Sequence, residues 1–323
     1  LWGNLGYCDY DGKERIVSTN KGSAYIKIAE GCNNKCTYCV IPYLRGPYKS
    51  RNMQSIIEEA EFLVSAGVRE LILIAQDTTK YGSDLYGGNK LADLIREISK
   101  IQNLKWIRLL YCYPDQIDDK LIKEISNNDK VCKYLDIPIQ HASDRILKRM
   151  GRKGSSTEIE ELIKRLRNEI SNICIRTTFI VGFPGEDEED FSILYDFAKR
   201  TEFDRMGVFM YSKEEGTPAA KIKGHIRKSV KQARYEELMT LQNNIAMEKN
   251  NLRLDKIYDV LVEGVADDGI FYYGRSYAEA PDIDNLIYFT SENPLEEGSF
   301  VKVRILDSSQ YDLIGVVENE FTK

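Results

Sequence analysis

Residues 31–39 have the sequence GCNNKCTYC, which places Cys32, Cys36 and Cys39 in the spacing C-x3-C-x2-C directly after an apolar stretch over residues 24–30. Three closely spaced soft ligands predict a metal cluster. The spacing favours iron and sulfide over zinc, because a structural zinc site needs four ligands. It usually takes them from two separated C-x2-C pairs, or from one such pair and histidines. The other cysteines are scattered singly and the chain has only 2 histidines. Zinc, or three uncoordinated thiols in an ordinary loop, are the alternatives.

Short apolar runs alternate with amphipathic helical patterns over the first 254 residues. Strands are predicted over residues 24–30, 70–76, 105–111, 134–139, 174–182 and 204–211, and helices over 53–66, 91–101, 121–127, 158–170 and 189–200. This alternation predicts an α/β fold with a parallel sheet and right-handed crossovers. Six units rather than eight predict a partial (β/α)6 TIM-like barrel, whose functional loops follow the carboxyl ends of the strands.

The pattern changes after a long helix predicted over residues 227–254. Short alternating strands follow over 257–263, 270–275, 286–289, 300–306 and 311–317. They predict a small antiparallel β-barrel. We therefore expect a linker remnant over residues 1–20, a core domain over 21–254 and the β-barrel domain over 255–323.

Charge separates the two domains. Residues 255–323 contain 15 Asp or Glu against 5 Lys or Arg, a net charge of −10, whereas the whole chain carries −6. An acidic barrel repels a nucleic-acid backbone and suits a basic protein partner, unless the charge serves only solubility. The composition, 42% hydrophobic and 30% charged, predicts an ordinary soluble protein. No apolar run is long enough to cross a membrane, and the odd number of cysteines fits the reducing cytoplasm.

Polar side chains lie at the ends of two predicted strands and within a third, where they are expected to contact a ligand. Gln76 and Asp77 follow the second strand, Gln140 and His141 follow the fourth, and Arg176 lies in the fifth. Each has a structural alternative: Asp77 as a turn residue, His141 as a buried hydrogen-bonding residue, and Arg176 as the partner of an acidic neighbour.

A basic cluster surrounds Met150 and Gly151. It consists of Arg145, Lys148, Arg149, Arg152 and Lys153. The cluster predicts phosphate or carboxylate binding or, alternatively, a solvated helix face. The preceding Ser143 and Asp144 predict a helix cap.

Six motifs occur in a fixed order: GCNNKCTYCVIP, LIAQDTTKYG, WIRLLYCYP, DIPIQHASDRILKRMGR, RTTFIVGFPGE and EEGTPA. Together they resemble the methylthiotransferase branch of the radical S-adenosylmethionine (SAM) enzymes, followed by a TRAM barrel, over nearly the whole chain. Within that branch, the AQDTT and LLYCYP motifs resemble the ribosomal-protein aspartate methylthiotransferases, the RimO family, rather than the enzymes that modify tRNA adenosines.

This resemblance implies that Cys32, Cys36 and Cys39 hold a [4Fe-4S] cluster with one open iron, to which SAM binds. It implies that Tyr38 leans on the adenine and that Arg176 pairs with the methionyl carboxylate. A low-potential electron donor such as flavodoxin or ferredoxin reduces the cluster, and SAM is cleaved to a 5′-deoxyadenosyl radical. The radical then takes a hydrogen from the β carbon of an aspartate in small-subunit ribosomal protein twelve, where a methylthio group is inserted.

Full-length members of that family carry a further amino-terminal domain, whose three cysteines hold a second cluster that supplies or carries the sulfur. Only Cys8 precedes the cysteine motif here, and Leu1 replaces an initiator methionine. We therefore expect a fragment that cleaves SAM without completing methylthiolation. Two rival interpretations are a tRNA methylthiotransferase and a non-catalytic fragment that only binds a partner.

Overall fold

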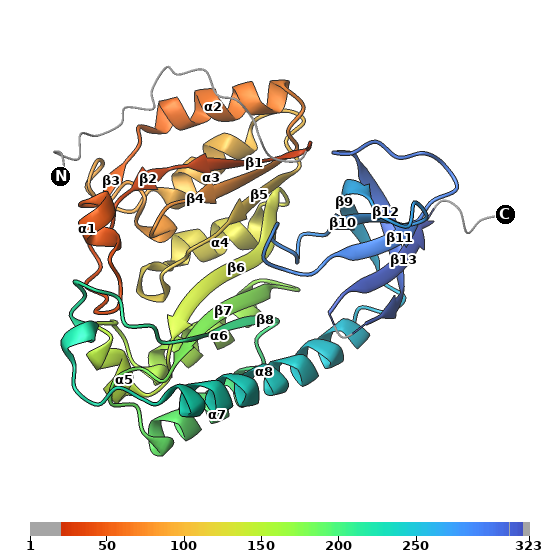
Figure 1. Cartoon of the computed structure of the whole chain (residues 1–323). Helices are drawn as coiled ribbons and strands as arrows, with labels where there is room; N and C mark the ends of the chain where they lie inside the picture. Colours follow the sequence, from red (N-terminus) through yellow and green to blue (C-terminus); the bar gives the residue numbers. More distant parts are fainter. Residues whose placement is uncertain (1–20, 310, 319–323) are drawn as a thin grey trace.

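Figure 1 shows the computed structural model of the protein, which describes residues 21–309 and 311–318. The linker remnant predicted over residues 1–20, including Cys8, lies outside the described residues.

Six parallel strands form the main sheet. They are β1 (Ser23–Lys27), β4 (Glu70–Ile74), β5 (Trp106–Leu109), β6 (Val131–Gln140), β7 (Cys174–Val181) and β8 (Arg205–Met210). Each strand pairs in parallel with the next one in this series, so the spatial order follows the sequence. The sheet stays open between β1 and β8. The predicted partial (β/α)6 barrel is therefore confirmed.

Helices cover one face of this sheet. They are α2 (Met53–Ser65), α3 (Leu91–Ser99), α4 (Asp119–Asn127), α6 (Ser156–Glu169), α7 (Glu188–Thr201) and α8 (Lys228–Asn251). In α2, the residues Ile56, Ala60 and Leu63 recur every three or four positions and are fully buried, which gives the helix one apolar face. Side chains of the strands and helices form one continuous core. Within residues 21–309 and 311–318, none of the helices is both long and apolar enough to cross a membrane.

The first predicted strand, over residues 24–30, is divided in the structure. Strand β1 ends at Lys27, and β2 (Ala29–Glu30) pairs antiparallel with β3 (Lys49–Ser50). The chain leaves the sheet at Ile28, whose N–H still donates to the Ile74 carbonyl oxygen at 3.0 Å. The two-stranded ribbon closes the base of the segment that carries the cysteines.

Two short helices were given no predicted range, because neither is long enough to show a helical period, although the predicted cap at Ser143 and Asp144 indicated the start of the second. They are α1 (Ile41–Arg45) and α5 (Asp144–Arg149). Ser143 occupies the N-cap position of α5, but its hydroxyl donates to Asp190 at 2.6 Å instead of capping the helix. The predicted cap position at Ser143 is therefore confirmed, although its side chain makes no cap hydrogen bond because the Asp190 carboxylate binds the hydroxyl.

Five strands after α8 form a closed barrel. They are β9 (Ile257–Val265), β10 (Tyr272–Arg275), β11 (Ile287–Thr290), β12 (Phe300–Ser308) and β13 (Leu313–Val317), with the neighbour order β10-β11-β13-β12-β9. The predicted small barrel is confirmed, with one correction to its antiparallel pairing. β11 and β13 run parallel, because the intervening β12 pairs with β9 and β13 rather than with β11.

The connection between β10 and β11 packs against the face of the sheet that the helices leave open (Figure 1). Its Ala278 and Ala280 lie in one apolar cluster with Cys132 and Cys174 of the sheet. Cys112 is also buried, so the single cysteines in the described residues are core side chains rather than further ligands of the motif.

Buried ion pairs join the barrel to the sheet. Glu70 of β4 accepts hydrogen bonds from Arg108 Nε at 2.7 Å and from an Arg275 NH2 group of β10 at 2.7 Å, and all three side chains are 0% exposed. Arg275 also pairs with Glu263 at 2.7 Å. Burial alone would raise the pKa of Glu70, but the guanidinium groups of Arg275 and Arg108 outweigh it and lower the pKa to about 2.

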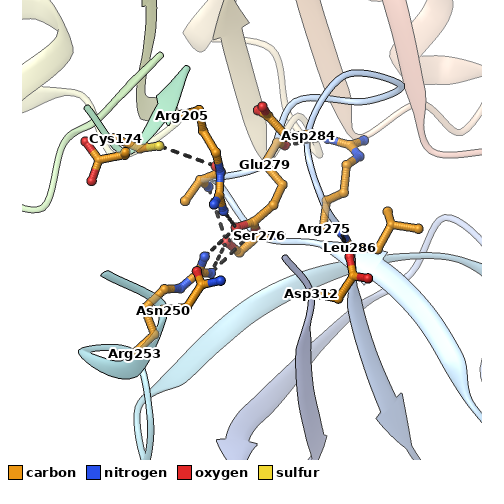
Figure 2. Close-up of polar contacts among 12 residues, drawn as sticks. Cys174, Arg205, Asn250, Arg253, Arg275, Ser276, Glu279, Asp284, Leu286 and Asp312 are labelled. Atoms are coloured by element: carbon orange, nitrogen blue, oxygen red, sulfur yellow. Dashed lines mark hydrogen bonds and ion pairs between the residues drawn. The ribbon is translucent and has the colours of Figure 1, made fainter. Parts of the chain in front are cut away.

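Figure 2 shows a second group of buried ion pairs, centred on Glu279 of the β10–β11 connection. Its carboxylate lies between Arg205 of β8, at 3.0 Å, and Arg253, which follows α8. Burial opposes ionisation of Glu279, yet Arg253 and Arg205 lower its pKa to about 2. Sheet, long helix and barrel therefore converge on one carboxylate.

Candidate active site

The three cysteines lie on the loop between β2 and α1, at the edge of the sheet where the strands end (Figure 1). Cys32, Cys36 and Cys39 are free thiols and partly buried. A backbone hydrogen bond holds the two ends of this segment together, since the Cys32 N–H donates to the Gly46 carbonyl oxygen at 3.1 Å. Gly31 has a φ of 75°, and a Cβ there would lie 2.2 Å from the Pro47 carbonyl oxygen, so glycine is required at this point.

Backbone donors lie next to two of the sulfur atoms. The Asn34 N–H donates to Cys32 Sγ at 3.4 Å, and the Ile41 N–H donates to Cys39 Sγ at 3.4 Å. Burial nevertheless raises the pKa of both thiols. Because metal ligation requires thiolates, a bound metal has to supply the positive charge that keeps them ionised.

The three thiols of this loop are soft ligands of the kind that hold an iron-sulfur cluster. Cys32, Cys36 and Cys39 are all partly buried and none is in a disulfide. As ligands of a [4Fe-4S] cluster, they would leave one iron without a ligand from this loop. Their binding of such a cluster, rather than of zinc, stays a prediction.

Hydrogen bonds of Thr37 hold the middle of the cysteine loop in place. The Thr37 N–H donates to the Met150 carbonyl oxygen at 2.9 Å, and the Thr37 hydroxyl donates to the Arg149 carbonyl oxygen at 2.8 Å. The Thr37 carbonyl oxygen accepts from the Ala219 N–H at 2.8 Å. The turn after α5 therefore positions the loop between Cys36 and Cys39.

Gly151→Ala is expected to lower the iron bound per chain severalfold. Gly151 has a φ of 71°, and a Cβ there would lie 2.3 Å from the Lys35 carbonyl oxygen, so alanine must displace the cysteine loop. Gly87 has the same φ of 71° with nothing within 4 Å of a Cβ, so Gly87→Ala carries only the backbone strain of about 1 kcal/mol. Iron and sulfide are measured after anaerobic reconstitution. Equal contents in the two variants would contradict the prediction.

Asp77 braces the cysteine loop from the end of β4. Its buried carboxylate accepts from Asn34 Nδ2 at 2.9 Å and from the Thr79 hydroxyl at 2.7 Å, and its carbonyl oxygen accepts from the Tyr48 hydroxyl at 3.0 Å. Sequence reasoning missed the contact with Asn34, although both residues lie in the motifs that carry the resemblance. A contact between Asp77 and SAM stays a prediction.

Residues at or just after the carboxyl ends of the neighbouring strands β4, β5 and β6 have an unpaired buried atom or an unusual backbone conformation. Gln76 Oε1 is buried and has no hydrogen-bond partner among the described residues, which suits an acceptor for a ligand. Tyr111 and Gln140 have left-handed φ values of 60° and 77°, and Tyr111 is 49% exposed. Such backbones cluster at functional sites. Sequence reasoning missed Tyr111, and the predicted contacts of Gln76 and Gln140 with SAM stay predictions.

His141 is fully buried among protein groups. Its Nδ1 accepts from the Ser143 N–H at 2.9 Å, and its Nε2 lies 3.5 Å from a Glu186 carboxylate oxygen. Nε2 has no hydrogen-bond partner among the described residues, so only Nδ1 matches the structural alternative for His141. The contact of His141 with a ligand stays a prediction.

Arg176 is already paired with two carboxylates. Its NH1 group donates to Asp136 at 2.9 Å, and its Nε lies 3.6 Å from Asp284 of the β10–β11 connection. The structure therefore shows the bracing role for Arg176, while pairing with the methionyl carboxylate stays a prediction.

Tyr38 lies against an apolar wall beside the cysteine loop. The wall consists of Ile146, Met150, Phe183, Tyr211 and Ala219. Burial raises the pKa of Tyr38 well above its usual value, so the phenol stays protonated. Its predicted contact with adenine stays a prediction.

The basic cluster around Gly151 divides into side chains with different partners. Arg145 pairs with Asp187 and Asp190. Arg152 instead turns inward, with its guanidinium carbon 3.8 Å from the centre of the Tyr113 ring. The Tyr113 hydroxyl lies 3.9 Å from Cys36 Sγ. Sequence reasoning missed Tyr113 altogether, although it lies in the LLYCYP motif.

Comparison with known proteins adds two family matches. The radical SAM superfamily model matches residues 26–198, and the TRAM domain model matches residues 256–317.

The chain is similar to curated ribosomal protein uS12 methylthiotransferases named RimO. It is 61% identical over 315 residues to the protein of Acetivibrio thermocellus, covering 98% of this chain and 70% of that one. It is 55% identical over 321 residues to a protein of Clostridium botulinum, covering 99% and 72%. Among solved structures, the radical SAM methyltransferase TsrM from Kitasatospora setae matches with a TM-score of 0.51 at 20% identity, over 62% of this chain and 38% of that one, and this likeness concerns the fold alone.

Proposed function

Because this chain belongs to the radical SAM superfamily and, within it, to the ribosomal protein uS12 methylthiotransferases, we propose that it methylthiolates the β carbon of an aspartate in that ribosomal protein. The observation that carries the proposal is the position of Cys32, Cys36 and Cys39 on one loop at the carboxyl edge of an open parallel sheet. That edge is where barrels of this kind place their chemistry.

The cluster and SAM, when bound, supply a 5′-deoxyadenosyl radical that can take hydrogen from an unactivated carbon. The protein contributes positioning. Cys32, Cys36 and Cys39 would hold the cluster, and Asp77 keeps their loop in place through Asn34. Gln76 offers a buried acceptor at the adjacent strand end, and we assign to it a hydrogen bond from SAM.

The barrel supports a basic protein as the partner. Its exposed carboxylates include Asp259, Asp267, Asp268, Glu292, Glu296, Glu297 and Asp307. Glu263 and Glu279, by contrast, are buried and paired with arginines, so they hold the domains together rather than face a partner. The exposed acidic groups would steer a basic ribosomal protein and repel tRNA.

We expect the reconstituted 323-residue chain to form 5′-deoxyadenosine from SAM when dithionite replaces the low-potential electron donor. We expect no sustained methylthiolation of uS12, because these residues contain one clustered set of cysteines and the sulfur is assigned to a second cluster. Both products are quantified by mass spectrometry, the second as a mass increase on a uS12 peptide. Sustained methylthiolated peptide from this chain alone would contradict the expectation.

Two further results would favour the rival interpretations. Tight tRNA binding that weakens steeply with salt would favour a tRNA substrate. A protein that stays colourless after anaerobic addition of iron and sulfide would favour a fragment that only binds a partner.

A further inference from the structure

Arg152 places a buried guanidinium beside the cysteine loop. It follows Gly151, is 9% exposed, and donates from an NH2 group to the Pro138 carbonyl oxygen of β6. Its guanidinium carbon stacks 3.8 Å from the centre of the Tyr113 ring. Stacking and the carbonyl contact together fix the orientation of the planar group.

Tyr113 links the guanidinium of Arg152 to Cys36. The hydroxyl of the ring on which Arg152 stacks lies 3.9 Å from Cys36 Sγ. Burial lowers the pKa of Arg152, but Tyr38, Tyr113 and Cys36 outweigh it and raise the pKa. The guanidinium therefore lies one aromatic ring away from the middle cysteine of the cluster site.

Other buried arginines in the described residues have carboxylate partners. Arg108 pairs with Glu70 at 2.7 Å, and Arg234 pairs with Glu186 at 2.7 Å. A buried positive charge with no anionic partner is costly, because the protein interior screens it poorly. A thiolate-bound iron-sulfur cluster would supply the negative charge that Arg152 otherwise lacks.

We propose that Arg152 is a positioning residue that raises the reduction potential of the cluster held by Cys32, Cys36 and Cys39. Reduction adds an electron to the cluster, and an adjacent positive charge stabilises the reduced state more than the oxidised state. This inference rests on the proposed radical SAM function, because that function assigns the cluster to these cysteines.

The test measures the cluster directly, before any SAM is added. Wild-type protein, Arg152→Gln and Lys148→Gln are reconstituted anaerobically with iron and sulfide, and the reduced cluster is quantified by electron paramagnetic resonance during a redox titration. We expect Arg152→Gln to bind as much iron as wild type. At a fixed potential its ratio of reduced to oxidised cluster should fall about tenfold, or about 59 mV for a one-electron couple. Lys148→Gln removes an exposed positive charge from the same segment and should leave the ratio unchanged.

Three results with the folded variants would overturn the proposal. They are an unchanged ratio in fully loaded Arg152→Gln, an equal change in Lys148→Gln, and folded Arg152→Gln and Arg152→Met that bind no iron. The last result would assign Arg152 to cluster assembly, and failure of both neutral variants to fold would assign it to structure. Because the titration contains no SAM, a normal shift without 5′-deoxyadenosine formation would count against the proposed function alone. Wild-type protein that binds no cluster would refute both.

Discussion

Cys36→Ala is expected to abolish 5′-deoxyadenosine formation, which is the largest effect we predict on activity. Removal of one thiolate leaves two loop ligands for a cluster that already has an iron without a cysteine. Loss of a residue that merely supports a metal ligand typically costs about 10- to 100-fold in metal affinity or activity, and loss of the ligand itself should cost more. Iron content and 5′-deoxyadenosine are measured on the same anaerobic preparation.

Cys112→Ala is the matched control for Cys36→Ala. It makes the same chemical change at a cysteine that is 0% exposed in the core. We expect it to cost some stability through the small cavity it leaves, while the cluster and SAM cleavage are retained. If both variants cleaved SAM as wild type does, the assignment of the cysteine loop would be wrong. If both variants lost activity because they failed to fold, the comparison would use Cys36→Ser instead, provided that this variant keeps the wild-type structure.

Arg275→Ala should give the largest loss of stability among the substitutions considered. It removes a guanidinium that is 0% exposed and leaves Glu70 and Glu263 short of a partner at the junction of barrel and sheet. Breaking a buried ion pair by removing one partner costs roughly 3 to 5 kcal/mol, because the remaining charge is uncompensated. The free energy of unfolding is measured by denaturant titration with a probe in each domain.

Arg304→Ala provides the contrast within the same barrel. Arg304 pairs with Glu318 at 2.6 Å, but the two side chains are 32% and 25% exposed. Because solvent screens such a pair, its loss should cost less than about 1 kcal/mol. Equal losses for Arg275→Ala and Arg304→Ala would refute the view that the buried network joins the two domains. Glu70→Gln added to Arg275→Ala should recover part of the loss, since it removes one unpaired charge.

The dependence of the free energy of unfolding on pH in the acid range gives a second measurement of the same buried ion-pair network. The folded-state pKa values of Glu70 and Glu279 are lowered from 4.5 to about 2. Their contribution to stability is therefore fully present above the unfolded-state value and is lost as the pH falls toward about 2. Arg275→Ala should flatten this dependence, because Glu70 then loses the guanidinium that does most to lower its pKa. An unchanged pH dependence of the free energy of unfolding would show that Arg275 does not lower the pKa of Glu70.

Prediction from the sequence succeeded where the signal was local. Apolar runs over residues 70–76 and 174–182 became β4 and β7 with small changes at their ends, since strand periodicity depends on neighbours along the chain. It failed where a tertiary partner competed with a local preference. The strand predicted over residues 24–30 is divided because its end pairs with β3. Ser143 is the N-cap residue of α5, but its hydroxyl donates to the Asp190 carboxylate instead of capping the helix.

The sequence by itself determined where the candidate metal site lies, because three thiols within eight residues and the strand before them predict a metal ligand set without any distant partner. Only the tertiary structure decided what the buried charges do. Arg275 and Glu70 are 205 residues apart in the chain yet lie 2.7 Å from each other. Arg152 lies beside the cysteine loop, one aromatic ring from Cys36, only because the turn after α5 folds onto that loop. A charged side chain in a sequence carries no record of its counterion, since the cost of burying it is met by whichever group the fold brings alongside.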